Sequence, residues 1–171
     1  MPDRVMGYVI ECLVEAYVLL GAGGGLTTAR PDEDVDHKDF FVDEAGGYRN
    51  VYAQVKGSPR LSRSGTLEVS VDYPEGKVLS DTRLIYVFCL LDVTGMRLSR
   101  IWVVPSVDFT RLAPRTRLSR GRVRLWFEAG RTGKWSRFEI EPTELGARLL
   151  RAVRAGKGAT TRKAARREAA V

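Results

Sequence analysis

The chain has 171 residues, of which 44% are hydrophobic, and a formal net charge of +7. This hydrophobic share is enough for a folded core and excludes a wholly disordered chain. His37 is the only histidine, and the two cysteines, Cys12 and Cys89, lie far apart, so a Cys/His zinc site and a disulfide framework are both excluded. The cysteine usage predicts a cytoplasmic protein, because disulfides are rare in the reducing cytosol.

The first predicted element is a helix over residues 5–20, where apolar residues recur near helical spacing. The glycine-rich run at 21–25 ends it. Glu11 and Glu15 interrupt its apolar stretch, so the segment is neither a secretory signal nor a membrane span. We therefore expect no membrane partner.

An acidic loop over residues 31–39 precedes two predicted strands, at 40–42 and 48–56. The short turn between them, at 44–47, predicts that they pair as a hairpin. Asp39 stands directly before the first of these strands. A tight hairpin would bring this carboxylate close to the second strand.

The remainder of the body is predicted to consist of strands and two helices. The strands are expected at 66–71, 83–91, 100–104, 121–128 and 134–140, the last two as a hairpin. The run at 83–91 is almost continuously apolar, which predicts a central strand buried on both faces. Ser106 is expected to cap a short helix, and residues 142–155 form a closing helix. This order predicts an α/β fold with a mixed central β-sheet flanked by helices.

The excess positive charge lies at the C-terminal end of the chain. From residue 146 onward there are eight basic residues and one acidic residue, Glu168, which together equal the whole net charge of +7. We expect a folded domain over residues 1–155 and a basic, flexible tail over 156–171. Such a tail either binds nucleic-acid backbones without sequence preference or serves as a solubilising terminus.

The strand at 48–56 carries the polar residues of greatest interest. Side chains alternate between the two faces of a strand, so Gln54 and Lys56 share one face while apolar residues occupy the other. The hairpin brings Asp39 towards the Gln54 and Lys56 side. On the preceding helix, Glu11 and Glu15 are four residues apart and lie on one face.

This order of residues resembles the PD-(D/E)XK nuclease superfamily. In that superfamily a helix carries an acid, an Asp begins a strand, and a following strand carries Glu or Gln, any residue, and Lys. The matching residues are Glu11 or Glu15, Asp39, Gln54, Val55 and Lys56. Over about residues 5–155 the chain is similar to uncharacterised bacterial restriction-endonuclease-like and Holliday-junction-resolvase-like members. The resemblance implies a restriction-endonuclease-like core.

The resemblance also implies a divalent-metal-dependent endonuclease that hydrolyses phosphodiester bonds in DNA, with Mg²⁺ or Mn²⁺ as its cofactor. Asp39 would be the principal metal ligand, joined by the side-chain carbonyl of Gln54 and the backbone carbonyl of Val55. Lys56 would orient the attacking water or stabilise the developing negative charge. Glu11 would complete the metal shell, directly or through water.

Several alternatives stay open at this point. Glu15 can take the place of Glu11, and Asp36 that of Asp39. Gln54 replaces the commoner Glu, which removes one negative charge and should weaken metal binding. The same fold also suits a non-catalytic nucleic-acid-binding or protein-interaction module, including a homodimer.

A second basic feature lies on the predicted strand at 121–128. Arg120, Arg122 and Arg124 alternate and so share a face, which either tracks phosphates or is an ordinary charged surface. The three tryptophans are expected to pack in the core or on a sheet face rather than to stack on bases.

Overall fold

The computed structural model describes residues 3–31, 39–47, 50–78 and 80–155, and the predicted tail at 156–171 lies outside them. The helical segments are α1 (Asp3–Gly21), α2 (Ser106–Leu112), the 3-10 turns η1 (Ser136–Phe138) and η2 (Pro142–Glu144), and a helix over residues 145–155. The strands are β1 (Leu26–Ala29), β2 (Phe40–Glu44), β3 (Asn50–Ser58), β4 (Leu67–Pro74), β5 (Leu84–Asp92), β6 (Arg97–Pro105), β7 (Arg115–Leu118), β8 (Arg122–Ala129) and β9 (Glu139–Ile140). Of the helices in this described part, none is long and apolar enough to cross a membrane.

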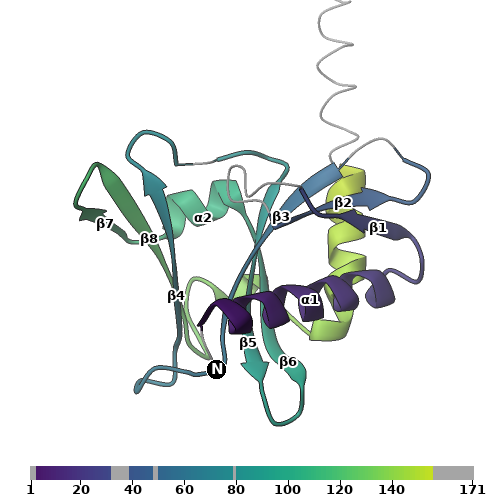
Figure 1. The fold of residues 1–171 in the computed structure, drawn as a ribbon, viewed down its shortest axis with the longest axis horizontal. Helices are drawn as coiled ribbons and strands as arrows, with labels where there is room; N and C mark the ends of the chain where they lie inside the picture. The colour runs from purple at the N-terminus through teal and green to yellow at the C-terminus, as the bar shows by residue number, and fades with distance from the viewer. Residues whose placement is uncertain (1–2, 32–38, 48–49, 79, 156–171) are drawn as a thin grey trace, which may run out of the picture.

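The strands form two sheets (Figure 1). The larger sheet has the order β1-β2-β3-β5-β6-β9, and the smaller sheet has the order β4-β8-β7. In the larger sheet β3 and β5 run parallel, and the other neighbours run antiparallel. The parallel pair arises because the chain leaves the larger sheet after β3, forms β4 in the smaller sheet, and returns as β5. The predicted α/β fold with a mixed central sheet flanked by helices is confirmed.

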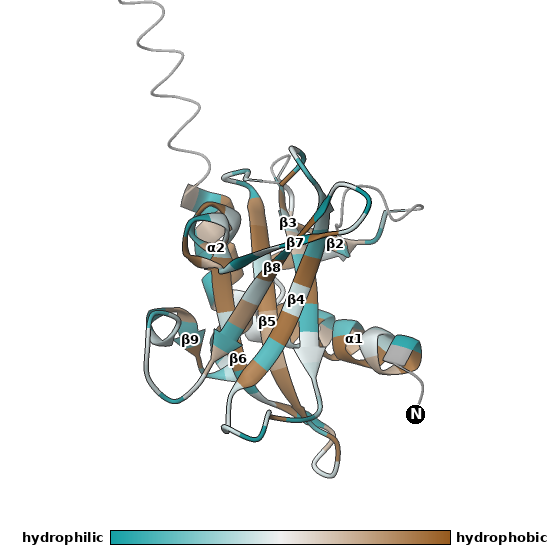
Figure 2. Cartoon of the chain, turned by 90° about the vertical axis from the view of Figure 1, so that its left-hand side faces the viewer, coloured by the Kyte–Doolittle hydropathy of each residue, from teal (hydrophilic) through white to brown (hydrophobic). Residues whose placement is uncertain are grey.

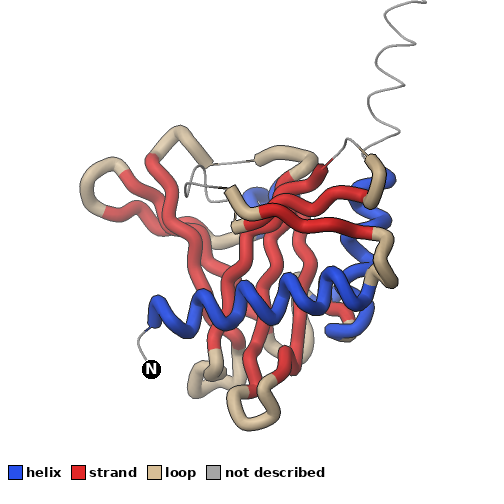
Figure 3. Tube along the Cα trace, turned by 45° about the vertical axis from the view of Figure 1, so that its right-hand side comes forward, coloured by secondary structure: helices blue, strands red, loops and turns tan. Residues whose placement is uncertain are grey.

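Each face of the larger sheet carries a hydrophobic core. On one face, α1 crosses the strands (Figure 3) and packs there together with the helix over residues 145–155. This core is mostly aliphatic, with Ile10, Val14 and Val18 from α1 and Leu145, Leu149 and Val153 from the C-terminal helix. On the other face, the smaller sheet and α2 enclose an aromatic core of Tyr73, Tyr86, Phe88, Trp102, Phe109, Phe127, Trp135 and Phe138.

The central position of β5 explains its apolar sequence. Val87 and Cys89 belong to the aliphatic core, whereas Tyr86 and Phe88 belong to the aromatic core. All four side chains are fully buried. A strand covered on both faces shows no polar alternation, so the prediction of a central strand buried on both sides is confirmed.

The smaller sheet alternates between apolar and polar residues because only one of its faces is covered (Figure 2). Along β8, Val123, Leu125 and Phe127 are buried against the aromatic core. The residues that alternate with them, from Arg122 to Glu128, face outwards. This is the expected pattern for a strand with one wet face.

The predicted hairpin between residues 121–128 and 134–140 is wrong. β8 pairs with β4 and β7 instead. The later segment holds η1 and the two-residue β9, which pairs with β6. Its large apolar residues, Trp135 and Phe138, close the aromatic core from a 3-10 turn.

The expected N-cap role of Ser106 is also wrong. Its hydroxyl donates to the carbonyl oxygen of Asp81 at 2.6 Å and accepts the Asp81 N–H at 2.9 Å. Pro105 occupies the N-cap position of α2 without a side-chain hydrogen bond. Ser106 therefore ties the segment before β5 to the start of α2.

Candidate active site

Asp39 lies beside the middle of β3, immediately before β2. Its backbone N–H donates to the carbonyl oxygen of Ala53 at 2.9 Å, which extends the β2–β3 ladder by one residue. Its side-chain Oδ2 accepts the N–H of Val55 at 2.5 Å. These two hydrogen bonds fix the Asp39 carboxylate against the stretch of backbone that joins Gln54 to Lys56.

Gln54 faces the smaller sheet and is only 1% exposed. Its Oε1 accepts the hydroxyl proton of Tyr73, on β4, at an oxygen–oxygen distance of 3.3 Å. The Tyr73 hydroxyl is hydrogen-bonded in turn to the hydroxyl of Tyr86, on β5. A buried carboxamide is costly unless it has such a partner, so the tyrosine pair makes the burial of Gln54 tolerable.

The direction of this hydrogen-bond chain follows from the protonation of the two tyrosines. Burial raises the pKa of Tyr73 to about 12, with the Tyr86 hydrogen bond opposing the shift and the Asp39 charge adding to it. Burial also raises the pKa of Tyr86. Each hydroxyl is therefore neutral at physiological pH and has one proton to donate. Because Tyr73 gives its proton to Gln54, Tyr86 must donate to Tyr73.

Lys56 lies on the same face of β3 as Gln54 and is half-buried. The next residue, Gly57, is where two other elements approach β3 closely. A Cβ there would lie 2.7 Å from the carbonyl oxygen of Cys89 and 3.1 Å from the Cγ2 atom of Ile10. Glycine at this position lets β5 and α1 pack against the strand directly after Lys56.

Glu11 and Glu15 belong to α1, which packs on the opposite face of β3 from Gln54. Arg30, just after β1, binds Glu11 Oε2 at 3.2 Å and Glu15 Oε2 at 2.9 Å. Thr28 donates to Glu15 Oε1 at 2.7 Å. Partial burial alone would raise the pKa of Glu15, but the hydrogen bonds from Thr28 and Arg30 outweigh it and lower that pKa. Both helix acids are thus engaged by Arg30.

The donor atoms around Asp39 are oxygens, which suit a hard divalent cation. Because the N–H and C=O of one strand residue point to the same edge, the Val55 carbonyl lies on the Asp39 side of β3. A carbonyl oxygen has two lone pairs, so the bond from Tyr73 leaves one on Gln54 Oε1. Within the described ranges, no three side chains of His, Cys, Asp or Glu gather as a metal cluster.

Sequence reasoning does not find Tyr73 and Tyr86. Tyr73 lies 19 residues from Gln54, on a strand of the other sheet, so no fixed spacing links the two. The available signal is a tyrosine inside the apolar run of β5, because a buried hydroxyl requires a partner. The alternative acid Asp36 belongs to the segment 32–38, which lies outside the described residues.

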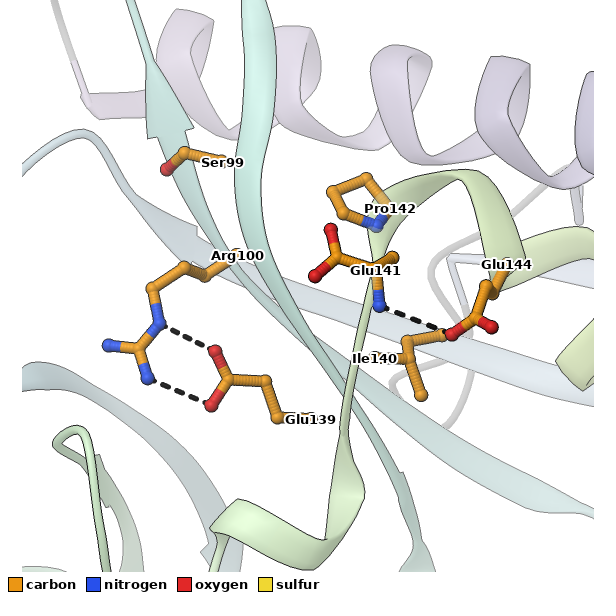
Figure 4. Close-up of a pocket in the computed structure, with 7 residues that line it drawn as sticks. All are labelled: Ser99, Arg100, Glu139, Ile140, Glu141, Pro142 and Glu144. Carbon is orange, nitrogen blue, oxygen red and sulfur yellow. Dashed lines mark hydrogen bonds and ion pairs between the residues drawn. The ribbon is translucent and has the colours of Figure 1, made fainter.

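A separate cavity of about 290 Å³ lies at the β6–β9 edge of the larger sheet (Figure 4). Its lining residues are Ser99, Arg100, Glu139, Ile140, Glu141, Pro142 and Glu144. Arg100 binds Glu139 through Nε at 2.6 Å and Nη2 at 2.8 Å, and Glu144 Oε2 accepts the Glu141 N–H at 3.4 Å. The lining comes from β6, β9 and the segment through η2, away from β2 and β3.

No family model matches the chain, and no curated protein matches it. Among solved structures, the chain is similar to a bacterial homing endonuclease, with a TM-score of 0.60 and 15% sequence identity. The match covers 92% of this chain and 98% of that one. The likeness at this identity is one of fold, and it gives the chain a nuclease-like fold.

Proposed function

We propose that the chain is a divalent-metal-dependent endonuclease of the PD-(D/E)XK type that hydrolyses phosphodiester bonds in DNA. The observation that carries the proposal is the hydrogen bond from Val55 N–H to Asp39, between Gln54 and Lys56. This contact of Asp39 with β3 supports the assignment of Asp39, Gln54 and Lys56 to one site. The fold shared with a homing endonuclease supports the choice of DNA as substrate.

The proposed metal ligands are Asp39, Gln54 Oε1 and the Val55 carbonyl; Glu11 lies on α1, on the other face of β3, so it would join the shell only through water. Bound Mg²⁺ or Mn²⁺ would supply charge stabilisation at the scissile phosphate. Asp39 is held by two backbone hydrogen bonds, so its carboxylate has little freedom to lose on binding a cation. Tyr73 holds the Gln54 carboxamide in the same way.

Lys56 would act on the attacking water and on the developing negative charge. It is half-buried on the Gln54 face of β3, where the lower dielectric strengthens its interaction with a phosphate. Its strand is fixed by parallel pairing with β5 on one side and by Asp39 on the other. The ammonium group thus starts from a rigid element.

The test is cleavage of supercoiled plasmid and branched DNA in Mg²⁺ or Mn²⁺. Asp39→Asn keeps a hydrogen-bond acceptor for Val55 but removes the charge, and Lys56→Ala removes the ammonium group. We expect each variant to lose cleavage by at least ~100-fold, the size found when one stabilising or proton-transfer group is removed. Unchanged cleavage in both folded variants would contradict the site assignment.

Matched controls are available for both changes. Asp43→Asn removes an acid from β2, the strand that directly follows Asp39. Lys134→Ala removes an exposed lysine near η1. Neither residue belongs to the proposed site, so both variants should cleave at the wild-type rate. Circular dichroism and thermal unfolding are to be measured for each variant to check that it is folded.

A second candidate function is a non-catalytic nucleic-acid-binding module on the same fold. The observation in its favour is that Gln54 is neutral and 1% exposed, which leaves Asp39, among the described residues, as the carboxylate bonded to β3. A site with one carboxylate binds a divalent cation weakly. Binding of DNA that persists in EDTA, with no cleavage at any Mg²⁺ or Mn²⁺ concentration, would favour this function.

A further inference from the structure

Five arginines gather where β7 turns into β8. They are Arg115, Arg117, Arg120, Arg122 and Arg124, and we call residues 115–124 the basic ribbon. The ten residues contain no acid. The sequence already indicates a basic face at Arg120, Arg122 and Arg124, and the pairing of β7 with β8 adds Arg115 and Arg117 to it.

The arginines lie on both faces of the smaller sheet. Arg122 and Arg124 alternate with buried residues of β8 and therefore face outwards. Arg115 and Arg117 pair across the ladder with Leu125 and Val123 and so share their inner face. Both are nonetheless exposed, because β7 is an edge strand beyond the cover of the core. The edge therefore presents positive charge on two sides.

Two carboxylates of the β4 side lie against the basic ribbon. Asp72 binds Arg124 at 2.6 Å and approaches Arg122 at 3.8 Å, and Glu75 binds Arg117 at 3.3 Å. Five arginines against these two acids leave a surplus of three positive charges. The side chains of Arg117 and Arg122 are 86% and 51% exposed, so much of this charge is available to an external anion.

Arg120 stands at the tip of the ribbon in a backbone conformation that favours glycine or asparagine. Its φ is 59°, and that of the following Gly121 is 62°. A non-glycine residue in this left-handed region is uncommon and costs about 1–2 kcal/mol. Arginine at this position places an exposed charge in the turn between β7 and β8.

We propose that the basic ribbon binds the phosphate backbone of duplex DNA and holds the duplex against the Asp39 site. The choice of DNA among polyanions rests on the proposed function. Figure 1 shows the β7–β8 connection at the upper left and the β2–β3 pair at the upper right, so both lie along the upper side of the molecule in this view. The ribbon also joins the site through β4, because Arg122 pairs with Pro74, the neighbour of the Tyr73 that binds Gln54.

The contact is to phosphates rather than to bases. Arginine pairs with phosphate through a planar fork of donors, which needs no particular base sequence. Trp126, the aromatic residue nearest to the ribbon on β8, is occupied by Arg124 over its ring at 5.5 Å and by a hydrogen bond to Thr116 at 3.2 Å. It is thus held against the sheet rather than presented to a base.

The test compares two triple variants of the full chain in EDTA, where no cleavage takes place. The ribbon variant is Arg117→Gln, Arg120→Asn and Arg122→Gln, in which asparagine suits the left-handed position. The control is Arg60→Gln, Arg63→Gln and Arg97→Gln, three exposed arginines of which the first two lie in the β3–β4 connection and the third begins β6. The β3–β4 connection and the β5–β6 turn lie along the lower edge of the view in Figure 1, away from the β7–β8 connection.

Affinity for a fluorescent DNA duplex is measured by anisotropy at several salt concentrations. Each lost phosphate contact lowers the slope of log K against log salt by ~0.9. We expect the ribbon variant to lose about 2–3 units of slope and at least ~10-fold in affinity. The control has the same net charge as the ribbon variant but keeps every arginine of the ribbon, so it should keep the wild-type slope. Equal losses in the two variants would reduce the effect to net charge and overturn the proposal.

The single variant Arg120→Asn covers the case in which the triple variant does not fold. It should lower the slope by about 1 unit, and an unchanged slope would overturn the contact at the tip. A loss seen with duplex RNA but not with duplex DNA would also overturn the proposal. Because binding is measured without metal, it stands or fails separately from cleavage. If the protein never cleaves DNA but the ribbon variant still loses slope, the basic ribbon binds DNA and the proposed nuclease activity is wrong.

Discussion

On one face of β3, Val51, Ala53 and Val55 pack into the aliphatic core under α1, whereas on the other face Gln54 is buried in front of the smaller sheet. The first face is sealed by shape and apolar area alone. The second holds the hydrogen-bond chain from Tyr86 through Tyr73 to Gln54, beside Asp39. A buried polar chain contributes little net stability but is costly when broken. This difference indicates that Gln54 and the two tyrosine hydroxyls are not required for packing, which makes them candidates for a functional role.

The largest expected difference between the two faces comes from neighbouring residues of β5. Phe88 and Cys89 are both fully buried. The Phe88 ring stacks on that of Phe127 with 3.9 Å between the ring centroids, whereas Cys89 faces the aliphatic core. Phe88→Ala should lower the free energy of unfolding by about 3–5 kcal/mol because it leaves a large cavity. Cys89→Ala removes a single sulfur and should cost far less. Urea denaturation measures both, and equal losses would contradict the contrast.

Tyr73→Phe breaks the polar chain without changing its shape. The variant leaves Gln54 Oε1 without the donor that holds it, so we expect a loss of about 1–3 kcal/mol in the free energy of unfolding. Tyr86→Phe removes only the outer donor and should cost less. Urea denaturation of the two single variants and of the double variant gives the coupling. Equal and fully additive losses would show that the two hydroxyls act independently.

Much of the architecture could be predicted from local pattern. The helix over 5–20 follows from its apolar spacing, the hairpin after Asp39 from its short turn, and the buried strand at 83–91 from its continuous apolar run, and the structure contains all three. β1 and β7 have four residues each, too few to show a period. The prediction of a hairpin at 134–140 was wrong because this segment buries Trp135 and Phe138 from a 3-10 turn and has only two residues in a strand, which pairs with β6.

The candidate site was less predictable than the fold for a physical reason. Alternation along β3 indicates that Gln54 and Lys56 share a face, but it does not indicate what covers that face. The cover is β4, which belongs to a second sheet, so the burial of Gln54 depends on contacts between residues distant in sequence. The pairing of Glu11 with Arg30 likewise depends on β1, which the sequence did not reveal.

Alkaline pH should lower the free energy of unfolding through the hydrogen-bond chain on the Gln54 face of β3. The pKa of Tyr73 is raised from 10.0 to about 12, so its contribution is fully present below pH 10 and is lost as the pH rises towards 12. At pH 11, between the two pKa values, the loss from Tyr73 should be on the order of 1 kcal/mol. Denaturation of wild type and Tyr73→Phe across this range isolates it, since the other titrating groups are common to both. Parallel pH profiles would contradict the burial of this hydroxyl.

The smallest effect is expected on the α1 side, where the acids are partly exposed. Glu15→Gln should lower the free energy of unfolding by no more than ~1 kcal/mol, because solvent screens the Glu15–Arg30 pair. The lowered pKa of Glu15 means that this contribution is present above pH 4.5 and is lost as the pH falls.

Glu11→Gln distinguishes the two helix acids. If Glu11 joins the metal shell through water, the variant should need several-fold more Mg²⁺ for half-maximal cleavage, while Glu15→Gln should not. The effect should stay smaller than that of Asp39→Asn, because Arg30 already neutralises part of the Glu11 charge at 3.2 Å. If Glu11→Gln needs no more Mg²⁺ than the wild type, the metal site excludes Glu11 and is limited to β3 and Asp39. In that case α1 contributes packing alone.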